Sequence, residues 1–140
     1  MRARTDLVKL AEAEYDLAII GGGIIRTGVA RDAAMRGLRT VLFEKEDFCY
    51  GTSGLKGAYV YYDSQIALTE RLCMENVVSA QSHGALLLNH AKVVRLAKEN
   101  NAVSGVEVKD TLTRESAEFR SKLVVNVGGP WLDEVFRSQA

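Results

Sequence analysis

Tyr15-Asp-Leu-Ala-Ile-Ile-Gly-Gly-Gly-Ile-Ile-Arg26 is the stretch that decides the fold, because a β-prone run stops there at three consecutive glycines. The apolar run over residues 15–20 is continuous rather than alternating, which is typical of a strand buried on both faces of a parallel sheet. Residues 24–36 then predict a helix that ends at Gly37, with one side at helical spacing: Ile25, Val29, Ala33, and Met35 or Arg36. Residues 38–44 form a second β-prone run. The order strand, glycine turn, helix, strand predicts a βαβ unit with a right-handed crossover.

Glycines between a strand and a helix are typical of dinucleotide-binding sites. A first glycine, here Gly21, allows the tight turn, and a second, Gly23, lets a pyrophosphate approach the backbone. Free N–H groups at the start of the helix then favour the diphosphate. Glu44 lies 23 residues beyond Gly21, at the end of the second strand, where a carboxylate can accept hydrogen bonds from a ribose 2′-hydroxyl. The same charge would repel a 2′-phosphate, so the pattern predicts a dinucleotide site and argues against NADP.

Arg26 departs from this pattern, because the fingerprint has a third glycine there so that helix and strand can pack closely. Gly28, two residues later, does not replace it. Two interpretations of Arg26 stay open. Its side chain turns outwards and adds positive charge to the phosphate site, or it weakens or abolishes the site. The steric demand of the turn favours the second.

The middle of the chain is expected to hold a loop, a helix and a strand. Residues 45–57 are glycine-rich and predict the loop. Asp63 or Ser64 is expected to cap a helix that runs to about Ser82, with one apolar side: Ile66, Leu72, Val77 and Val78. Residues 85–88 predict another buried strand. His83 and His90 flank it, and we interpret both as surface or turn residues rather than catalytic bases.

The last third of the chain changes character. Residues 93–98, 103–109 and 117–120 are short amphipathic runs with turn residues at 100–101 and 111–115, which predicts an antiparallel meander. Residues 123–127 predict a further buried parallel strand that ends at Gly128-Gly-Pro130, and residues 131–140 predict a helix opened by the proline. The fold class is therefore α/β: a Rossmann-like domain whose parallel sheet carries an antiparallel β-meander as a crossover.

Length and composition fit one soluble domain over residues 1–140, with 47% hydrophobic and 26% charged residues. The 18 basic and 18 acidic residues leave no net charge, which argues against a nucleic-acid partner. Cys49 and Cys73 are too few for a disulfide framework or a metal site, so we interpret them as reduced thiols of a cytoplasmic protein. No apolar run is long enough to span a bilayer. The N-terminal 14 residues lack the apolar core of a signal peptide and predict a short helix with one apolar side: Leu7, Leu10 and Ala11.

Six blocks follow one another along the chain in a characteristic order and wording. They are Tyr15-Asp-Leu-Ala-Ile-Ile-Gly-Gly-Gly-Ile-Ile25, Ala30-Arg-Asp-Ala-Ala-Met-Arg-Gly-Leu38, Phe43-Glu-Lys-Glu-Asp-Phe48, Gly51-Thr-Ser-Gly54, Gly57-Ala-Tyr-Val-Tyr-Tyr-Asp63 and Val124-Val-Asn-Val-Gly-Gly-Pro-Trp131. Each block is ordinary for the glutathione-reductase-like FAD superfamily. Together, over about residues 15–135, they resemble the FAD-dependent glycerol-3-phosphate dehydrogenase family.

That resemblance implies FAD as the cofactor and assigns residues to it. Three residues of the turn would face the diphosphate, Glu44 and its neighbour the adenosine ribose, and a Thr-Ser pair the phosphates. A valine would present its backbone to adenine, and two late glycines would make the second flavin contact. In that order, the implied residues are Gly21, Gly23, Ile24, Glu44, Lys45, Thr52, Ser53, Val93, Gly128 and Gly129. The resemblance assigns no catalytic residue here and no metal.

The resemblance also implies a reaction. In that family the flavin N5 takes a hydride from C2 of sn-glycerol 3-phosphate, which gives dihydroxyacetone phosphate, and the electrons pass to a quinone-type acceptor at the membrane. It therefore implies glycerol 3-phosphate as the small-molecule substrate. It also implies a cytoplasmic protein with peripheral contact at the inner face of the membrane.

This chain departs from the family in length. Gly54 is followed almost at once by Leu55-Lys-Gly57, so the long section of the substrate domain is missing between about 54 and 57, and the family's C-terminal part is absent as well. Three functions stay open: an FAD-dependent enzyme of glycerol 3-phosphate metabolism, a non-catalytic nucleotide-binding remnant or subunit that needs a partner chain, and another FAD-dependent oxidase of the superfamily. The block from Gly57 to Asp63 argues against the last.

Overall fold

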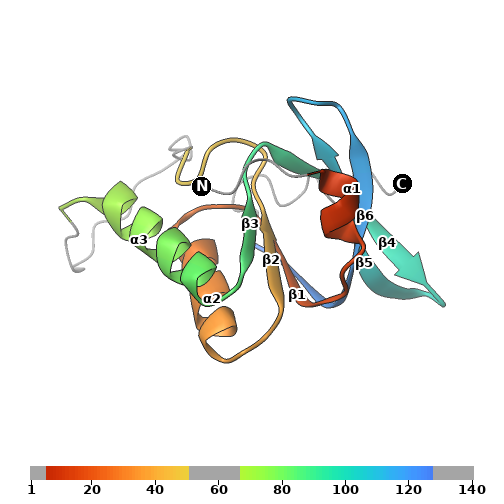
Figure 1. Ribbon diagram of the computed structural model, residues 1–140, viewed down its shortest axis with the longest axis horizontal. Coiled ribbons are helices and arrows are strands. Elements are labelled where there is room, and N and C mark those ends of the chain that lie inside the picture. The colour runs from red at the N-terminus through yellow and green to blue at the C-terminus, as the bar shows by residue number, and fades with distance from the viewer. Residues whose placement is uncertain (1–5, 51–66, 128–140) are drawn as a thin grey trace, which may run out of the picture.

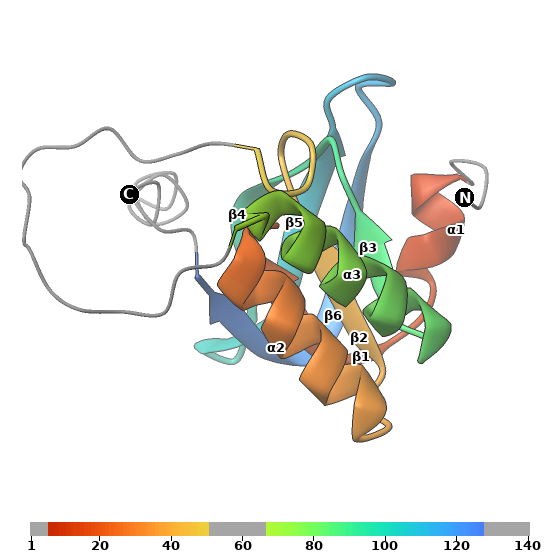
Figure 2. The same ribbon diagram turned by 90° about the vertical axis from the view of Figure 1, so that its left-hand side faces the viewer.

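The computed structural model of the chain describes residues 6–50 and 67–127. Its elements, in sequence order, are α1 (Leu7–Ala11), β1 (Tyr15–Ile20), α2 (Ile24–Met35), β2 (Thr40–Phe43), α3 (Thr69–Ser82), β3 (Leu86–Leu88), β4 (Ala91–Glu99), β5 (Ala102–Asp110) and β6 (Ser116–Asn126). Helices α2 and α3 lie together on one side of the parallel strands, whereas α1 lies on the other side near β4, β5 and β6 (Figure 1). Turning the molecule brings α2 and α3 in front of the sheet that they cover (Figure 2).

The strands form one sheet in the order β3-β2-β1-β6-β5-β4. Strand β1 pairs in parallel with β2 and with β6, and β2 pairs in parallel with β3. Strands β4, β5 and β6 pair antiparallel. The predicted α/β fold, a parallel Rossmann-like sheet with an antiparallel meander, is therefore confirmed.

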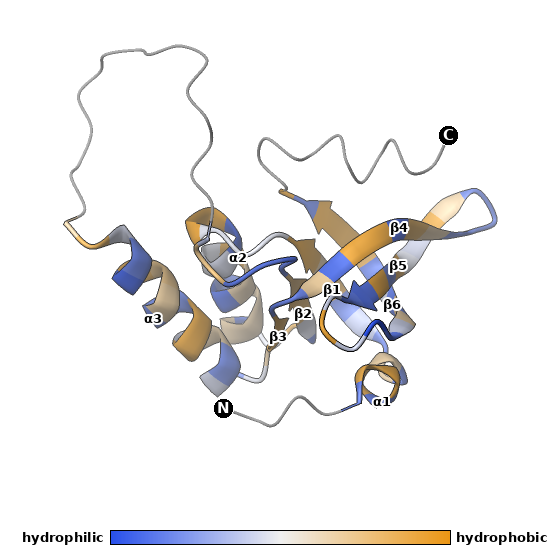
Figure 3. Cartoon of the chain, turned by 90° about the horizontal axis from the view of Figure 1, so that it is seen from above, coloured by the Kyte–Doolittle hydropathy of each residue, from blue (hydrophilic) through white to orange (hydrophobic). Residues whose placement is uncertain are grey.

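The continuous apolar runs of β1 and β2 place the core on both faces of the parallel strands. Every residue of β2 is buried, and in β1 only Asp16 is partly exposed. On the face toward α1, the Phe43 and Phe119 rings meet edge to face with centroids 4.8 Å apart. On the opposite face, Ile19 and Leu42 pack beneath the alanines of α2. Hydrophobic colour runs along β1 and β2, whereas β4 alternates between hydrophobic and hydrophilic (Figure 3).

Helix α2 packs on the sheet through small residues: Thr27, Ala30, Ala33 and Ala34. The prediction that Ile25 and Met35 lie on its buried side is wrong, since they are 68% and 53% exposed. Small side chains allow the helix axis to approach the strands, and the two larger residues lie outside that contact. The predicted stop at Gly37 fits the structure, because Gly37 has a φ of +80° and its N–H donates to the Ala34 carbonyl at 2.9 Å.

Helix α3 begins at Thr69 without a side-chain cap. The predicted caps, Asp63 and Ser64, lie outside the described residues. Val77 is buried as predicted, but Val78 is 62% exposed, which corrects the prediction that both face the core. Successive helical residues are about 100° apart around the axis, so two neighbours rarely share a narrow buried face. Cys73 and Ala80 complete that face.

Strand β6 is one continuous strand, whereas residues 117–120 and 123–127 were expected to form two. Its first part pairs with β5, Phe119 opposite Val106, and its second part pairs with β1, Leu123 beside Leu17. Ser121 and Lys122, between the two predicted runs, include no glycine, proline or asparagine that would favour a turn. Within residues 6–50 and 67–127, no helix combines the length and apolarity needed to cross a bilayer.

Candidate functional site

The glycine turn joins the carboxyl end of β1 to the start of α2. Gly21 has a φ of +105°, which favours glycine, and its N–H donates to the Phe43 carbonyl at 2.8 Å. Gly23 is the N-cap residue of α2, and its carbonyl accepts the hydrogen bond of Thr27 N–H at 3.0 Å. Within the described residues, no side-chain oxygen caps this helix end, and its first turn contains no acidic residue. The first N–H groups of a helix have no partner within the helix, so they are suited to an anion.

Glu44 reaches this turn from the end of β2. Strands β1 and β2 run in parallel with Ile20 beside Phe43, so their carboxyl ends meet at one edge of the sheet. Glu44 Oε2 accepts the Gly22 N–H at 2.5 Å, and Oε1 accepts the Glu46 N–H at 2.9 Å. A carboxylate offers about four acceptor positions, so each oxygen keeps one for a hydroxyl group. The carboxylate thus points into the turn and can still bind a sugar diol.

Gly22 is a site residue that the fingerprint spacing does not single out. A Cβ atom at Gly22 would lie 2.7 Å from Glu44 Cβ and 2.9 Å from Phe48 Cδ1, distances that real Cβ atoms do not reach. Its carbonyl also accepts the Cys49 N–H at 3.1 Å. The absence of a side chain at Gly22 therefore lets the chain segment after β2 close onto the turn. The signal in the sequence was the run of three glycines, of which the fingerprint uses two.

The Arg26 side chain folds back over the glycine turn instead of turning outwards. Its Nε donates to the carbonyl of Val127, directly after β6. The same nitrogen lies 3.0 Å from the position that a Gly21 Cβ would take, and Nη1 lies still closer to the corresponding position at Gly23. The guanidinium therefore bridges the start of α2 and the end of β6. It fills space that the two fingerprint glycines leave open.

Cys49 and Cys73 form a disulfide with their Cα atoms 6.4 Å apart, so the prediction of two reduced thiols is wrong. Cys49 lies in the segment after β2, and Cys73 is a buried residue of α3. Cys73 Sγ lies 3.7 Å from the Gly22 carbonyl oxygen, which places the bridge against the glycine turn. The two cysteines are 24 positions apart, and a count of cysteines does not reveal that α3 crosses behind the end of β2.

The other predicted cofactor residues are only partly placed. Ile24 is the first residue of α2, and the half-buried Lys45 follows Glu44. Val93 is buried in β4, two residues after Ala91, whose N–H donates to the Glu44 carbonyl at 2.8 Å. The start of β4 therefore lies beside Glu44, but the roles of these three residues stay predictions. Thr52, Ser53, Gly128 and Gly129 lie outside the described residues.

A small polar cluster borders the same edge of the sheet. Asp47 Oδ1 lies 3.1 Å from His90 Nε2 and accepts a hydrogen bond from Asn89 Nδ2 at 2.9 Å. The His90 N–H donates to the Glu46 carbonyl at 3.1 Å, so the segments after β2 and β3 are joined. His90 has a φ of +50°, and His83 is the exposed C-cap residue of α3. Both histidines are turn residues, as the sequence predicts.

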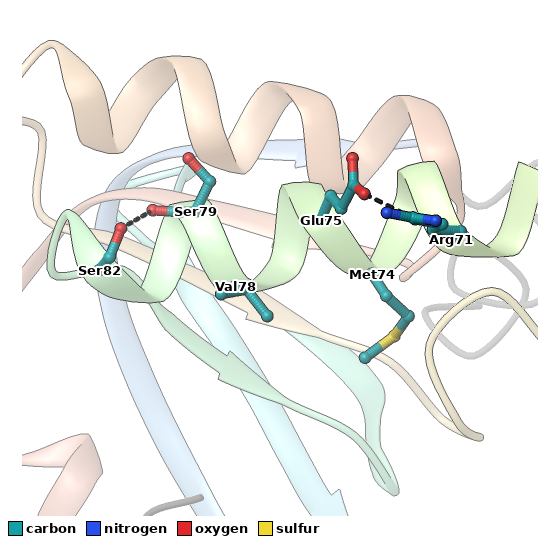
Figure 4. Close-up of a pocket in the computed structure, with 6 residues that line it drawn as sticks. All are labelled: Arg71, Met74, Glu75, Val78, Ser79 and Ser82. Carbon is teal, nitrogen blue, oxygen red and sulfur yellow. Dashed lines mark hydrogen bonds and ion pairs between the residues drawn. The ribbon is translucent and has the colours of Figure 1, made fainter.

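An open hollow lies on the outer surface of α3, apart from these groups. Its lining residues all come from that helix: Arg71, Met74, Glu75, Val78, Ser79 and Ser82 (Figure 4). Arg71 and Glu75 form an ion pair of 2.9 Å, one turn apart along the helix. None of the lining residues belongs to the glycine turn or to the end of β2. The hollow is therefore not part of the candidate nucleotide site.

Comparison with known proteins identifies relatives of the whole fold. A computed structural alignment with the glycerol-3-phosphate dehydrogenase from Bacillus halodurans, crystallised with FAD, has a TM-score of 0.78 at 27% identity and covers 93% of this chain and 37% of that one. The glycine oxidase from Bacillus cereus aligns with a TM-score of 0.69 at 18% identity, which shows a shared fold.

Comparison of amino-acid sequences finds relatives of the same kind. The glycerol-3-phosphate dehydrogenase of Synechocystis is 27% identical and covers 91% of this chain, with 41% of the relative aligned. The alpha-glycerophosphate oxidase of Enterococcus casseliflavus is 26% identical over 89% of the chain and 37% of the relative. This chain thus spans about two fifths of the length of such relatives. The Synechocystis alignment runs over 227 positions although the chain has 140 residues, so the relative has residues within the aligned span that this chain lacks.

The family itself is identified by a sequence profile described as FAD dependent oxidoreductase. It matches residues 16–55 and 54–140, two segments that meet at Gly54 and Leu55. Together they include the glycine turn, Glu44 and every strand of the sheet except the first residue of β1, Tyr15. The chain therefore belongs to the FAD dependent oxidoreductase family.

Proposed function

We propose that this chain binds FAD and forms the flavin-binding part of an oxidoreductase of the glycerol-3-phosphate dehydrogenase type. One observation carries the proposal: the Glu44 carboxylate lies at the glycine turn, within hydrogen-bond distance of Gly22, at the carboxyl ends of two adjacent parallel strands. Ligands of open α/β sheets bind at this edge. The adenosine ribose would meet Glu44, and adenine would lie toward the start of β4.

The described residues fit the two halves of FAD unequally. The side toward the ribose offers an acidic group with free acceptor positions, which suits a diol. The side toward the diphosphate offers the start of α2, but the Arg26 guanidinium fills the space beside Gly21 and Gly23 in this structure. Bound FAD would supply a hydride acceptor, and the protein's contribution would be to hold and orient it.

We propose glycerol 3-phosphate as the substrate of the complete site, because relatives that cover most of this chain are named for oxidising it. The two family matches meet at residues 54–55. We propose that the substrate section of longer relatives is missing there, between about 54 and 57, from a single domain of residues 1–140. We expect the chain alone to bind flavin without oxidising the substrate. Contact with the inner face of a membrane remains a prediction that rests on the resemblance alone.

The visible spectrum of the purified chain tests the proposal. We expect flavin absorption bands, or saturable quenching of FAD fluorescence when FAD is added to the colourless chain. Anaerobic addition of glycerol 3-phosphate should leave the bands unbleached. Bleaching would show a complete enzyme, whereas a chain that remains colourless and does not quench FAD at any concentration would refute the proposal.

Replacement of Glu44 by glutamine tests the ribose contact. Hydrogen bonds to a charged group are worth about 1.5–3 kcal/mol, so the Glu44→Gln variant should bind FAD roughly 10- to 100-fold more weakly. Glu46→Gln is the matched control, because Glu46 is exposed and contacts Glu44 through its backbone N–H. Equal affinity of Glu44→Gln and the control would remove Glu44 from the site.

A second candidate is a binding subunit that depends on a partner chain for catalysis. The length of the aligned span favours it, since the relatives contain residues inside that span for which this chain has no counterpart. Size-exclusion chromatography of the chain purified from its native source, followed by a glycerol 3-phosphate oxidation assay, separates the two candidates. Activity that co-elutes with a larger complex and is lost from the isolated chain would favour the subunit.

A further inference from the structure

We infer that Arg26 is an internal occupant of the diphosphate subsite, which FAD must displace in order to bind. This inference rests on the proposed FAD site and concerns the residue that sets its affinity. The second glycine of the fingerprint, here Gly23, is required because a pyrophosphate must come close to the backbone, where a side chain would stand.

The position of the guanidinium coincides with that space. Arg26 Nη1 lies against the position that a Cβ atom of Gly23 would take, and Arg26 Nε and Cδ lie 3.0 Å and 3.1 Å from the corresponding position at Gly21. Neither glycine has a side chain in this space, and the side chain of Arg26 fills it instead. A diphosphate that needs this space would collide with the guanidinium.

Arg26 is also held in this place by a bond of its own. Its Nε donates to the Val127 carbonyl. Val127 directly follows β6, and its N–H lies 3.4 Å from the Ile20 carbonyl, so it extends the pairing of β6 with β1. The side chain thus connects the start of α2 to the end of β6. A diphosphate that enters between them must break this charge-assisted hydrogen bond.

The positive charge of Arg26 would favour a bound diphosphate, whereas the volume of its side chain opposes binding. Arg26 is the third residue of α2, and a cation in the first turn is unfavourable toward the positive end of the helix dipole. No acidic residue in that turn balances it. A cation at this end would attract a diphosphate if the side chain could stand beside it. Because the guanidinium takes the space beside Gly21 and Gly23 that a diphosphate needs in order to approach the backbone, the anion and the side chain compete for one place.

The test compares the affinity of the full chain and two variants for FAD and for adenosine, by titration calorimetry. Arg26→Gly and Arg26→Ala should bind FAD roughly tenfold or more tightly than the unchanged chain, since one charge-assisted hydrogen bond no longer has to be broken. Adenosine, which has no phosphate, should bind all three chains equally. Arg31→Ala is the matched control, because it removes a positive charge from the same helix and should leave the FAD affinity unchanged.

The outcomes separate this inference from the proposed function. If both Arg26 variants bind FAD as weakly as, or more weakly than, the unchanged chain while adenosine still binds, Arg26 is not a competitor and the inference is overturned, but the nucleotide site stands. If no chain binds FAD or adenosine, both fall. The thermal midpoints of the variants, measured without ligand, must show folded protein, and Arg26→Ala guards against loss of helix stability through a new glycine.

Discussion

A carboxylate that accepts backbone N–H groups lies at each end of β1, Asp16 of β1 itself at one end and Glu44 from the end of β2 at the other, but only one of these ends is suited to bind a ligand. At the amino end, Asp16 Oδ2 accepts the Arg39 N–H at 2.9 Å, and Oδ1 pairs with Lys122 Nζ at 2.7 Å. At the carboxyl end, Glu44 accepts two backbone N–H groups, from Gly22 and Glu46. The first carboxylate pairs with a cation of β6, whereas the second, among the described residues, accepts two backbone N–H groups, which leave it room to accept a hydroxyl donor.

This difference shows how one sheet divides structural and binding roles between its edges. The polar contacts of Asp16 join β1 to Arg39, directly before β2, and to β6, at the edge where α2 ends rather than where it begins. The contacts of Glu44 lie where the start of α2, a disulfide and the Arg26 guanidinium converge. Changes at the carboxyl end should therefore affect nucleotide affinity, and changes at the amino end should affect stability alone.

The largest expected effect on nucleotide affinity is that of Gly22→Ala. The new methyl group would collide with Glu44 Cβ and Cγ and with the Phe48 ring, so the segment after β2 must move away from the turn. Overpacking of this kind costs about 1–3 kcal/mol of stability. If about 3 kcal/mol of ribose and backbone contacts is lost as well, the FAD affinity falls roughly 100-fold. Titration with FAD measures this loss of affinity, with Gly22→Ala introduced once into the unchanged chain and once into the Arg26→Gly chain.

Gly28→Ala is the control for this substitution. Gly28 lies inside α2, and among the described residues a Cβ atom there would meet only Asn76 Nδ2, at 3.9 Å. Alanine in a helix interior is more favourable than glycine by about 0.5–1 kcal/mol, so this variant should be slightly more stable and should bind FAD normally. A Gly22→Ala chain that behaves like the Gly28→Ala chain would contradict the close approach of Glu44 to the turn.

An intermediate effect is expected from the removal of the disulfide. Cross-linking across 24 positions is worth about 3 kcal/mol in the chain-entropy account, so the Cys49→Ser/Cys73→Ser variant should unfold at a clearly lower urea concentration. The bridge also ties the segment that follows Glu44 to α3 beside Gly22, so we expect FAD affinity to fall roughly tenfold once that segment is released.

Reduction supplies an independent version of the same experiment. Dithiothreitol should bring the unchanged chain to the urea midpoint and FAD affinity of the double variant, and it should leave the double variant as it was. If the reductant changes neither property of the unchanged chain, the cysteines are not bridged in solution, and the interpretation as reduced thiols would return.

The local parts of this molecule could be predicted from the sequence, because their signals lie within a few residues of one another. The run over β1, the stop at Gly37 and the antiparallel meander follow from periodicity and turn residues. Even the meeting of Glu44 with the turn was predictable, since adjacent parallel strands bring their carboxyl ends to one edge.

The parts that could not be predicted depend on contacts between distant segments. The orientation of Arg26 is fixed by a carbonyl 101 positions away, and the disulfide forms because α3 passes behind the end of β2. Ile25 was expected in the core because it is apolar, but the close contact of α2 with the sheet is made by alanines. Residue type and spacing contain too little information about such packing.

The smallest effect is expected at the amino end of β1, from Asp16→Asn. The hydrogen bond from Lys122, followed by that of the Arg39 N–H, lowers the pKa of Asp16 below its usual 3.8. A carboxyl whose pKa is lowered on folding stabilises the folded state above that value, and the stabilisation is lost as the pH falls through the lowered pKa. The unchanged chain should therefore be slightly more stable than Asp16→Asn at neutral pH, and the two urea midpoints should converge in acid.

The contribution of the Asp16–Lys122 pair to stability should also be lost at high pH. Asp16 raises the pKa of Lys122 above its usual 10.5, so the same pair also loses its contribution as the pH rises through that raised value. Glu118→Gln removes an exposed charge from β6, the strand that contains Lys122. Its urea midpoint should not approach that of the unchanged chain in either acid or alkali. FAD affinity should be equal in all three chains at neutral pH. A weaker FAD affinity in Asp16→Asn alone would mean that the two ends of β1 are coupled, and the separation of structural from binding roles along the strand would no longer hold.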